Sequence, residues 1–173
     1  METELLTPDE AGLQKAAGLI REGQVVGMPT ETVYGLAADA TNRDAVAKVF
    51  AAKGRPMDNP LIVHISSMEE LEQAVSRVPE LVASLADAFW PGPLTMIMPK
   101  SERIPMETSG GLDTVGVRMP SHPVAQALIR TAGVPIAAPS ANRSGYPSPT
   151  TAQHVLADMQ GRIPVILDGG ACS

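Results

Sequence analysis

Cysteine and aromatic residues are scarce in this 173-residue chain, and each shortage limits what the protein can be. The single cysteine, Cys172, has no partner for a disulfide within the chain, which suits a reducing compartment. Aromatic residues make up only 3% of the sequence, whereas hydrophobic residues make up 44%. The core must therefore consist mainly of Val, Ile, Leu, Ala and Met. The length of the chain suits one domain.

The chain also lacks long apolar segments and an excess of positive charge. Its longest apolar runs are too short to cross a bilayer, and the acidic start, METELLTPDE, does not have the pattern of a signal peptide. The formal net charge of −6 disfavours broad charge-driven binding of nucleic acid, although a local basic groove would still be compatible with it. We therefore expect a cytoplasmic protein without membrane contact.

Several common motifs for nucleotides, metals and covalent catalysis are missing. Neither of the standard glycine-rich phosphate loops occurs, and no G-x-S-x-G elbow is present. His64, His122 and His154 lie far apart without metal-ligand spacing, so we expect no metal held by the protein itself. A Ser/His/Asp triad assembled from distant residues is a minor alternative.

Hydrophobic periodicity predicts alternating helices and strands, which is typical of an α/β domain. We expect helices capped by Thr7 and Asn42, a third opened by a capping box from Ser67 to Glu70, and a flexible loop at 109–111. Further helices are predicted over 79–88, 122–130 and 151–160, and strands over 24–28, 61–65, 94–98, 114–119, 136–138 and 165–167. No linker or repeat suggests a second domain.

Four polar clusters follow predicted strands or helices, where open α/β sheets bind their ligands. The first, PTETVYG at 29–35, is either a polar turn around a Tyr-Gly pair or a hydrogen-bonding wall. In the second, Lys53 and Arg55 either satisfy carbonyl groups at a helix end or bring two cations to one polyanion. Arg118, in the third, ends an apolar strand and either snorkels or pairs with a carboxylate. The fourth, APSANRSG at 138–145 with PSPT at 147–150, is either an ordinary loop or a rigid binding loop.

Together these clusters resemble the YrdC-like family of threonylcarbamoyl-AMP synthases, which act in making the threonylcarbamoyladenosine modification of tRNA. The matching segments run from about Leu6 to the end and are PTETVYGLAADA, KGRPMDNPLIVHI, FWPGPLT, VGVRMPSHP, APSANRSGYPSPT and DGGACS. The K-x-R and S-x-N pair is the most specific of these features. The resemblance implies an α/β fold in which residues 1–173 form a single domain, a twisted mixed sheet with helices around a concave cavity.

The resemblance also implies the reaction. L-threonine, bicarbonate and ATP would give threonylcarbamoyl-adenylate and pyrophosphate, through attack of a threonine carbamate on the α-phosphate. Positioning and positive charge would suffice without a protein nucleophile, and Mg²⁺ would accompany ATP. A downstream tRNA-modifying transferase would be a partner, with weak RNA binding as a further possibility. The alternatives are a relative that makes a carbamoyl-adenylate from carbamoyl phosphate, and an RNA-binding module without catalysis.

The resemblance assigns each candidate residue to one end of the pocket. Lys53 and Arg55 are expected to be catalytic, by binding the phosphates and the carbamate. The expected ATP-binding residues are Lys53, Arg55, Thr114, Ser140, Asn142 and Ser148. The expected threonine-binding residues are Thr30, Thr32, Tyr34, His64, Arg118 and the backbone of Ala138.

Two of these expectations have alternatives, and one feature departs from the family. His64 could equally be a histidine at the edge of the core. Glu31 is expected to shape its loop rather than orient the threonine amine. Family members continue beyond the D-G-G segment into another strand, so the chain looks truncated at its C-terminus. We expect it to be less stable or less active than a longer version.

Overall fold

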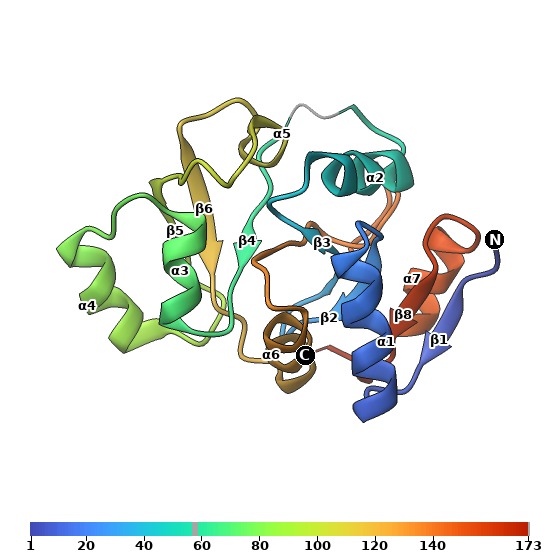
Figure 1. Ribbon diagram of the computed structural model, residues 1–173. Helices are drawn as coiled ribbons and strands as arrows, with labels where there is room; N and C mark the ends of the chain where they lie inside the picture. Colours follow the sequence, from blue (N-terminus) through green and yellow to red (C-terminus); the bar gives the residue numbers. More distant parts are fainter. Residues whose placement is uncertain (57–58, 173) are drawn as a thin grey trace.

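Within residues 1–56 and 59–172, which the computed structural model describes, eight strands form one mixed sheet and seven helices pack against it (Figure 1). The strands are β1 (Glu4–Leu6), β2 (Val26–Pro29), β3 (Tyr34–Asp39), β4 (Val63–His64), β5 (Thr95–Pro99), β6 (Thr114–Arg118), β7 (Ile136–Ala137) and β8 (Val165–Leu167). The helices are α1 (Glu10–Arg21), α2 (Arg43–Lys53), α3 (Met68–Ala74), α4 (Glu80–Phe89), α5 (Met106–Ser109), α6 (Pro123–Ala132) and α7 (Ala152–Met159). None of the helices in this part of the chain is long and apolar enough to span a bilayer.

The strand order is β1-β8-β2-β3-β7-β4-β6-β5, and the sheet contains both parallel and antiparallel pairs. Strand β8 lies parallel to both β1 and β2, while β3 is antiparallel to β2 and to β7. In the other half, β4 is parallel to β6 and antiparallel to β7, and β5 closes the sheet against β6. This confirms the predicted α/β class with a mixed sheet.

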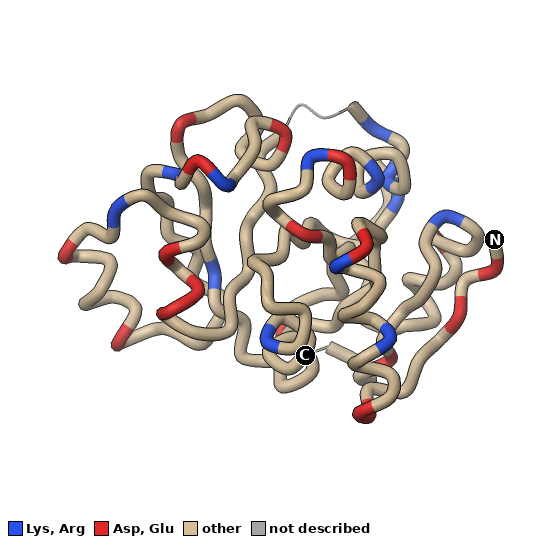
Figure 2. Tube along the Cα trace, viewed as in Figure 1, with Lys and Arg blue, Asp and Glu red and all other residues tan. Residues whose placement is uncertain are grey.

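The two halves of the sheet are covered differently. Helices α1 and α6 share one hydrophobic cluster with β2 and β8, and α2 and α7 share another with β3. Helices α3 and α4 cover the face of β4, β5 and β6 that presents Val63, Met96 and Val117. Because side chains alternate along a strand, the opposite face presents Ile62, which is 40% exposed, and Ile97, which is 71% exposed. One face of this half is therefore open. Basic and acidic residues are interspersed along the chain in both halves (Figure 2).

Some predicted helix ends are confirmed and others are wrong. Asn42 caps α2 by accepting from the backbone N–H groups of residues 44 and 45, and Gly54 ends the helix in the left-handed conformation, as its lack of a Cβ allows. The first helix begins later than expected, because the Asp9 carboxylate rather than Thr7 accepts the bond from the Gly12 N–H, at 2.8 Å.

The predicted capping box and flexible loop are also wrong. Ser67 makes no side-chain cap bond; instead the Glu70 carboxylate accepts from the backbone N–H and the hydroxyl of Ser66, both at 2.6 Å. Residues 109–111 form a tight helix end rather than a flexible loop. Ser109 is the buried last residue of α5, and Gly110 has φ 66°. A Cβ at Gly110 would lie 2.6 Å from the backbone nitrogen of Pro60, so only glycine fits.

Strands β1 and β3 were missing from the sequence prediction, and β3 replaces the predicted Tyr-Gly turn. The turn comprises residues 30–33 instead, where the Thr30 N–H donates to the Val33 carbonyl at 3.2 Å. Tyr34 and Gly35 already pair with Pro29 and Met28 in an antiparallel hairpin. The segment YGLAAD has few β-branched or aromatic residues, so its strand character comes from burial between β2 and β7 rather than from propensity.

Candidate functional site

Backbone hydrogen bonds join the first and fourth polar clusters around the start of β3. The Tyr34 N–H donates to the Pro149 carbonyl at 2.9 Å, and the Tyr34 carbonyl accepts from the Ala141 N–H at 2.8 Å. Gly35 also forms an isolated antiparallel bridge with Ser140. The hairpin that begins at PTETVYG and the loop that carries S-x-N are therefore one connected layer.

The K-x-R and S-x-N signatures meet directly. The Lys53 ammonium donates to the Ser140 carbonyl at 2.5 Å and to the Asn142 carbonyl at 2.9 Å. The Ser140 hydroxyl in turn donates to Oδ1 of Asn142 at 2.5 Å. Lys53 is only 3% exposed, so its charge lies inside the protein. The lysine does satisfy carbonyl groups, but those of a distant loop rather than those of its own helix.

Further bonds make the S-x-N loop rigid. The side-chain amide of Asn142 donates to the carbonyls of Arg143 and Tyr146, both at 2.9 Å. The Ser144 N–H donates to the Lys53 carbonyl at 2.8 Å, which ties the loop to the end of α2 a second time. This favours the interpretation of a rigid loop over that of an ordinary surface turn.

The electrostatics of the K-x-R segment favour an anion. Burial, assisted by the nearby Arg55 charge and opposed by Asp158, lowers the pKa of Lys53 to about 8. The guanidinium of Arg55 lies 5.4 Å from the centre of the Phe50 ring. Its Nε is buried and has no hydrogen-bond partner within the described ranges. A buried donor of this kind can contribute a bond to an incoming oxygen anion.

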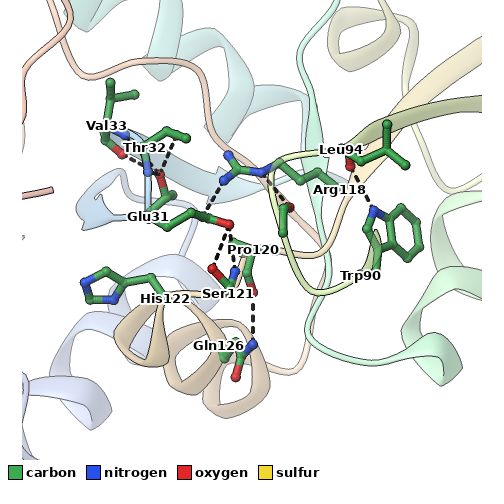
Figure 3. Close-up of polar contacts among 12 residues, drawn as sticks. Glu31, Thr32, Val33, Trp90, Leu94, Arg118, Pro120, Ser121, His122 and Gln126 are labelled. Carbon is green, nitrogen blue, oxygen red and sulfur yellow. Dashed lines mark hydrogen bonds and ion pairs between the residues drawn. The ribbon is translucent and has the colours of Figure 1, made fainter. Parts of the chain in front are cut away.

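Arg118 pairs with Glu31, the acid of the first cluster (Figure 3). Its Nη2 contacts Oε1 of Glu31, and its Nε donates to the Gly92 carbonyl at 3.2 Å. The other oxygen of Glu31, Oε2, accepts from the Ser121 N–H at 3.0 Å and from the Ser121 hydroxyl at 2.9 Å. The interpretation that Arg118 pairs with a carboxylate is confirmed, and that carboxylate belongs to the protein.

The surroundings of this pair keep it ionised. Burial acts to raise the pKa of Glu31, but the bonds from Ser121 and the charge of Arg118 outweigh it and hold the pKa below its usual value. Burial lowers the pKa of Arg118, against the opposing effect of Glu31. At 8% exposure, the arginine is a buried cation supported by a carboxylate.

Thr30 and Thr32 occupy the same turn in different ways. The buried Thr30 hydroxyl donates to the Val33 carbonyl at 2.6 Å and accepts from the N–H groups of Thr32 and Val33, both at 3.2 Å. Thr32 is exposed, with its hydroxyl 3.1 Å from that of Thr30. Thr30 therefore shapes the turn, and Thr32 is the threonine whose side chain is open to a ligand.

Tyr34 is fully buried, and its hydroxyl bonds to the end of the chain. The hydroxyl donates to the Gly170 carbonyl at 2.7 Å and accepts from the Gly169 N–H at 3.1 Å. Burial, opposed by the bond from Gly169, raises the pKa of Tyr34 to about 12. In this structure the Tyr34 hydroxyl holds residues 169 and 170 against β3.

His64 lies beside Arg118 in the parallel pairing of β4 with β6. It is buried, and its Nδ1 lies 3.2 Å from the Ile62 carbonyl. Burial and the Arg118 charge lower the pKa of His64 to about 4, so the ring is neutral near pH 7. Ala138 is joined to the same segment, because its N–H donates to the Ile62 carbonyl at 3.2 Å.

Within the described residues, the side chains of Thr114 and Ser148 make no hydrogen bond to the Lys53–Ser140–Asn142 group or to the Arg118–Glu31 pair. Thr114 begins β6 and shares its open face with Gly116 and Arg118. It borders a cavity of about 260 Å³ on that face, lined by Pro60, Leu61, Ile62, Thr95, Ile97, Leu112, Thr114 and Gly116. Ser148 is exposed and borders another cavity, of about 250 Å³, beside His154 and Asp158 of α7.

Sequence reasoning missed the direct role of Glu31. It placed Tyr34 among the threonine-binding residues, and the structure shows that the Tyr34 hydroxyl bonds to Gly169 and Gly170. One signal could have identified Glu31. An arginine in an otherwise apolar strand needs a carboxylate partner, and Glu31 is the acidic residue of the first cluster.

Comparisons with known proteins give this geometry a family. The family model Sua5_yciO_yrdC, described as telomere recombination, matches residues 18–173. A protein of Pyrococcus abyssi named threonylcarbamoyl-AMP synthase is 57% identical over 94% of this chain and 48% of its own length. A Bacillus subtilis protein of the same name is 54% identical over 97% of this chain and 49% of its own length.

A solved structure agrees with these sequence matches. The crystal structure of P. abyssi Sua5 complexed with L-threonine has a TM-score of 0.93 and 54% identity, over 99% of this chain and 50% of the other. The present chain thus spans about half the length of these relatives. On the sequence match and the shared fold together, the chain belongs to the Sua5/YciO/YrdC family.

Proposed function

We propose that this chain catalyses, or forms the catalytic domain for, the synthesis of threonylcarbamoyl-AMP from L-threonine, bicarbonate and ATP. The observation that carries the proposal is the identity of 54–57% to relatives named threonylcarbamoyl-AMP synthase, over almost all of this chain. The solved relative that was complexed with L-threonine supports the choice of amino acid.

The geometry is consistent with this reaction because it gathers cations and neutral donors without a nucleophile. The threonine amine would combine with bicarbonate, with loss of water, to give a carbamate. A carbamate oxygen would then attack the α-phosphate, and pyrophosphate would leave. Arg55, with its unpartnered buried Nε, is suited to bind phosphate or carbamate oxygens. Lys53 would add its charge while holding the S-x-N loop, and Ser140 and Asn142 would form the wall on the nucleotide side.

At the other end of the pocket, Arg118 would bind the threonine carboxylate, and Thr32 would offer a hydroxyl. The neutral His64 would form part of the floor between them. Thr114 and its cavity would take a further part of ATP, and Ser148 would contact the nucleotide from the loop. The role of Ala138 would be limited to its backbone.

Mg²⁺ would arrive with ATP rather than in a site formed by the protein. No group of three or more His, Cys, Asp or Glu side chains that could hold a metal occurs within residues 1–56 and 59–172. The oxygens of the triphosphate would be its main ligands, because Mg²⁺ in nucleotide sites is held largely by substrate phosphates and water, and the ion would neutralise phosphate charge there. A tRNA-modifying transferase would then consume the labile adenylate, which would suit a cytoplasmic location.

The proposal is tested by incubating the chain with ATP, Mg²⁺, bicarbonate and a panel of amino acids, with mass detection of the adenylate. We expect product with L-threonine and release of pyrophosphate. If product forms only with another amino acid, that amino acid would replace L-threonine as the proposed substrate. Phosphate release with carbamoyl phosphate in place of threonine and bicarbonate would instead favour a carbamoyl-adenylate enzyme. RNA binding that weakens steeply with salt, without adenylate formation, would favour a binding module.

A further inference from the structure

Arg118 is held from two sides by segments that are far apart in the sequence. Its Nε donates to the Gly92 carbonyl in the loop before β5, and its Nη2 pairs with Glu31 in the turn between β2 and β3 (Figure 3). An arginine side chain is otherwise flexible, so two acceptors at fixed places restrict the direction in which the guanidinium points. Among the described residues, the remaining nitrogen, Nη1, makes no hydrogen bond.

Glu31 is itself held in place. Both of its carboxylate oxygens accept bonds, one from Arg118 and the other twice from Ser121, just before α6. The pair lies away from bulk water, since the side chains of Arg118 and Glu31 are only 10% and 21% exposed. The carboxylate thus connects three segments, namely the 30–33 turn, the end of β6 and the start of α6.

We propose that Glu31 is a positioning residue that orients the Arg118 guanidinium so that its free edge receives the carboxylate of the amino-acid substrate. This inference rests on the proposed function, in which Arg118 binds that carboxylate. It extends that proposal by giving the acid of PTETVYG an action through Arg118 rather than on the substrate amine. The three protein donors around Glu31 occupy three of the roughly four acceptor positions of its carboxylate, which leaves little capacity for a bond to the amine.

The test compares wild-type chain with Glu31→Gln, using calorimetric binding of L-threonine and of L-threoninamide. The glutamine has the same shape, but it is neutral. The NH2 group of the glutamine is a donor, and it would lie opposite another donor, either the Ser121 N–H or the Arg118 guanidinium. The guanidinium would therefore be held less firmly. We expect the Kd for L-threonine to rise about tenfold or more, because a charge-assisted carboxylate bond depends on the orientation of the arginine. The Kd for L-threoninamide, which keeps the amine but lacks the carboxylate, should stay within about twofold.

A matched control is Glu107→Gln, which removes the carboxylate of the ion pair with Arg43. The side chain of Glu107 is 23% exposed, close to that of Glu31, and the pair belongs to α5 and α2. The control should bind both ligands like wild type. Melting temperatures of both variants show whether either change acts through folding. A double variant with Arg118→Lys should lose little more L-threonine affinity than Arg118→Lys alone, since Glu31 acts through Arg118.

The outcomes separate this inference from the function on which it rests. If wild type binds L-threonine and Glu31→Gln binds it equally well, only the positioning role is overturned. Equal losses for L-threonine and L-threoninamide would assign Glu31 to the amine and also overturn it. A gain in L-threonine affinity would show that Glu31 competes with the substrate. If wild type binds no L-threonine at all, the proposed function fails and the inference fails with it.

Discussion

The ammonium of Lys53 lies 2.5 Å from the carbonyl oxygen of Ser140, across 87 residues of sequence. A second bond, to the Asn142 carbonyl, makes the lysine a link between the end of α2 and the S-x-N loop. Two signatures that are separate in the sequence are therefore one structural unit. The charge that the proposed reaction would need also holds the loop that would contact the nucleotide.

The first prediction concerns Lys53→Met, which removes this charge and both bonds. We expect a loss of unfolding free energy of about 1–3 kcal/mol, because buried carbonyls lose their donor. Adenylate formation should fall on the order of 100-fold, because the variant loses both the positive charge that would bind phosphate and the bonds that hold the S-x-N loop. Urea unfolding and a product assay measure the two effects. Lys48→Met, which changes an exposed lysine of the same helix, is the control, and an equally active Lys53→Met would contradict the prediction.

The second prediction concerns acid stability and His64. Its pKa is about 4 in the folded chain against 6.5 ordinarily, so the unfolded chain binds more protons between these values. The sign follows from this difference, because stability must fall as the pH decreases from 6.5 to 4. The contribution of His64 to this loss can reach about 3 kcal/mol.

His64→Gln should reduce that acid-side loss, which urea unfolding at a series of pH values would measure. His154 is exposed on α7, so His154→Gln is the matched control and should leave the pH dependence unchanged. An unchanged slope in the His64 variant would show that other groups cause the acid sensitivity.

The sequence predicted those elements whose local signals agree with the fold. Helix α2 carries both a good cap in Asn42 and a glycine stop in Gly54, and β6 is a run of apolar and β-branched residues. Strand β3 has no such signal, since its small residues become a strand only because β2 and β7 lie on either side. The sequence therefore predicts a turn at the Tyr-Gly pair, whereas this pair begins the strand that bonds to the S-x-N loop.

The sequence suggested candidate residues for the site, but it did not indicate how they are arranged. The sequence suggested Lys53 and Arg118 as candidate cations of the site, but their partners come from loops that only the folded chain brings near. The Glu31 carboxylate lies 87 residues from Arg118 in the sequence, and the Gly92 carbonyl has no side-chain signature at all. Thr114 and Ser148 keep their predicted roles as proposals.

The third prediction concerns Tyr34→Phe, which removes only the hydroxyl that bonds to Gly169 and Gly170. The unfolding free energy should fall by about 1–2 kcal/mol, because the two hydrogen bonds of the buried Tyr34 hydroxyl are lost. The amide of Gly169 should exchange with solvent faster, as measured by hydrogen exchange. Tyr146→Phe, at a tyrosine that is 50% exposed, should change neither quantity. Unchanged exchange at Gly169 would mean that other contacts hold the segment.

The last prediction concerns Gly116, which lies on the open face of β6 and lines the cavity there. A Cβ at Gly116 would lie 3.1 Å from Cγ2 of Thr95 and point into the cavity that Thr114 borders. Valine favours strands, so Gly116→Val should change the unfolding free energy by less than about 1 kcal/mol. It should nevertheless weaken ATP binding by about tenfold, because the side chain fills space that the ligand would occupy. Gly116→Ala should have a smaller effect in calorimetric titrations with ATP. If the alanine and valine variants both bind ATP like wild type, the cavity is not part of the nucleotide site, and Thr114 must be removed from it.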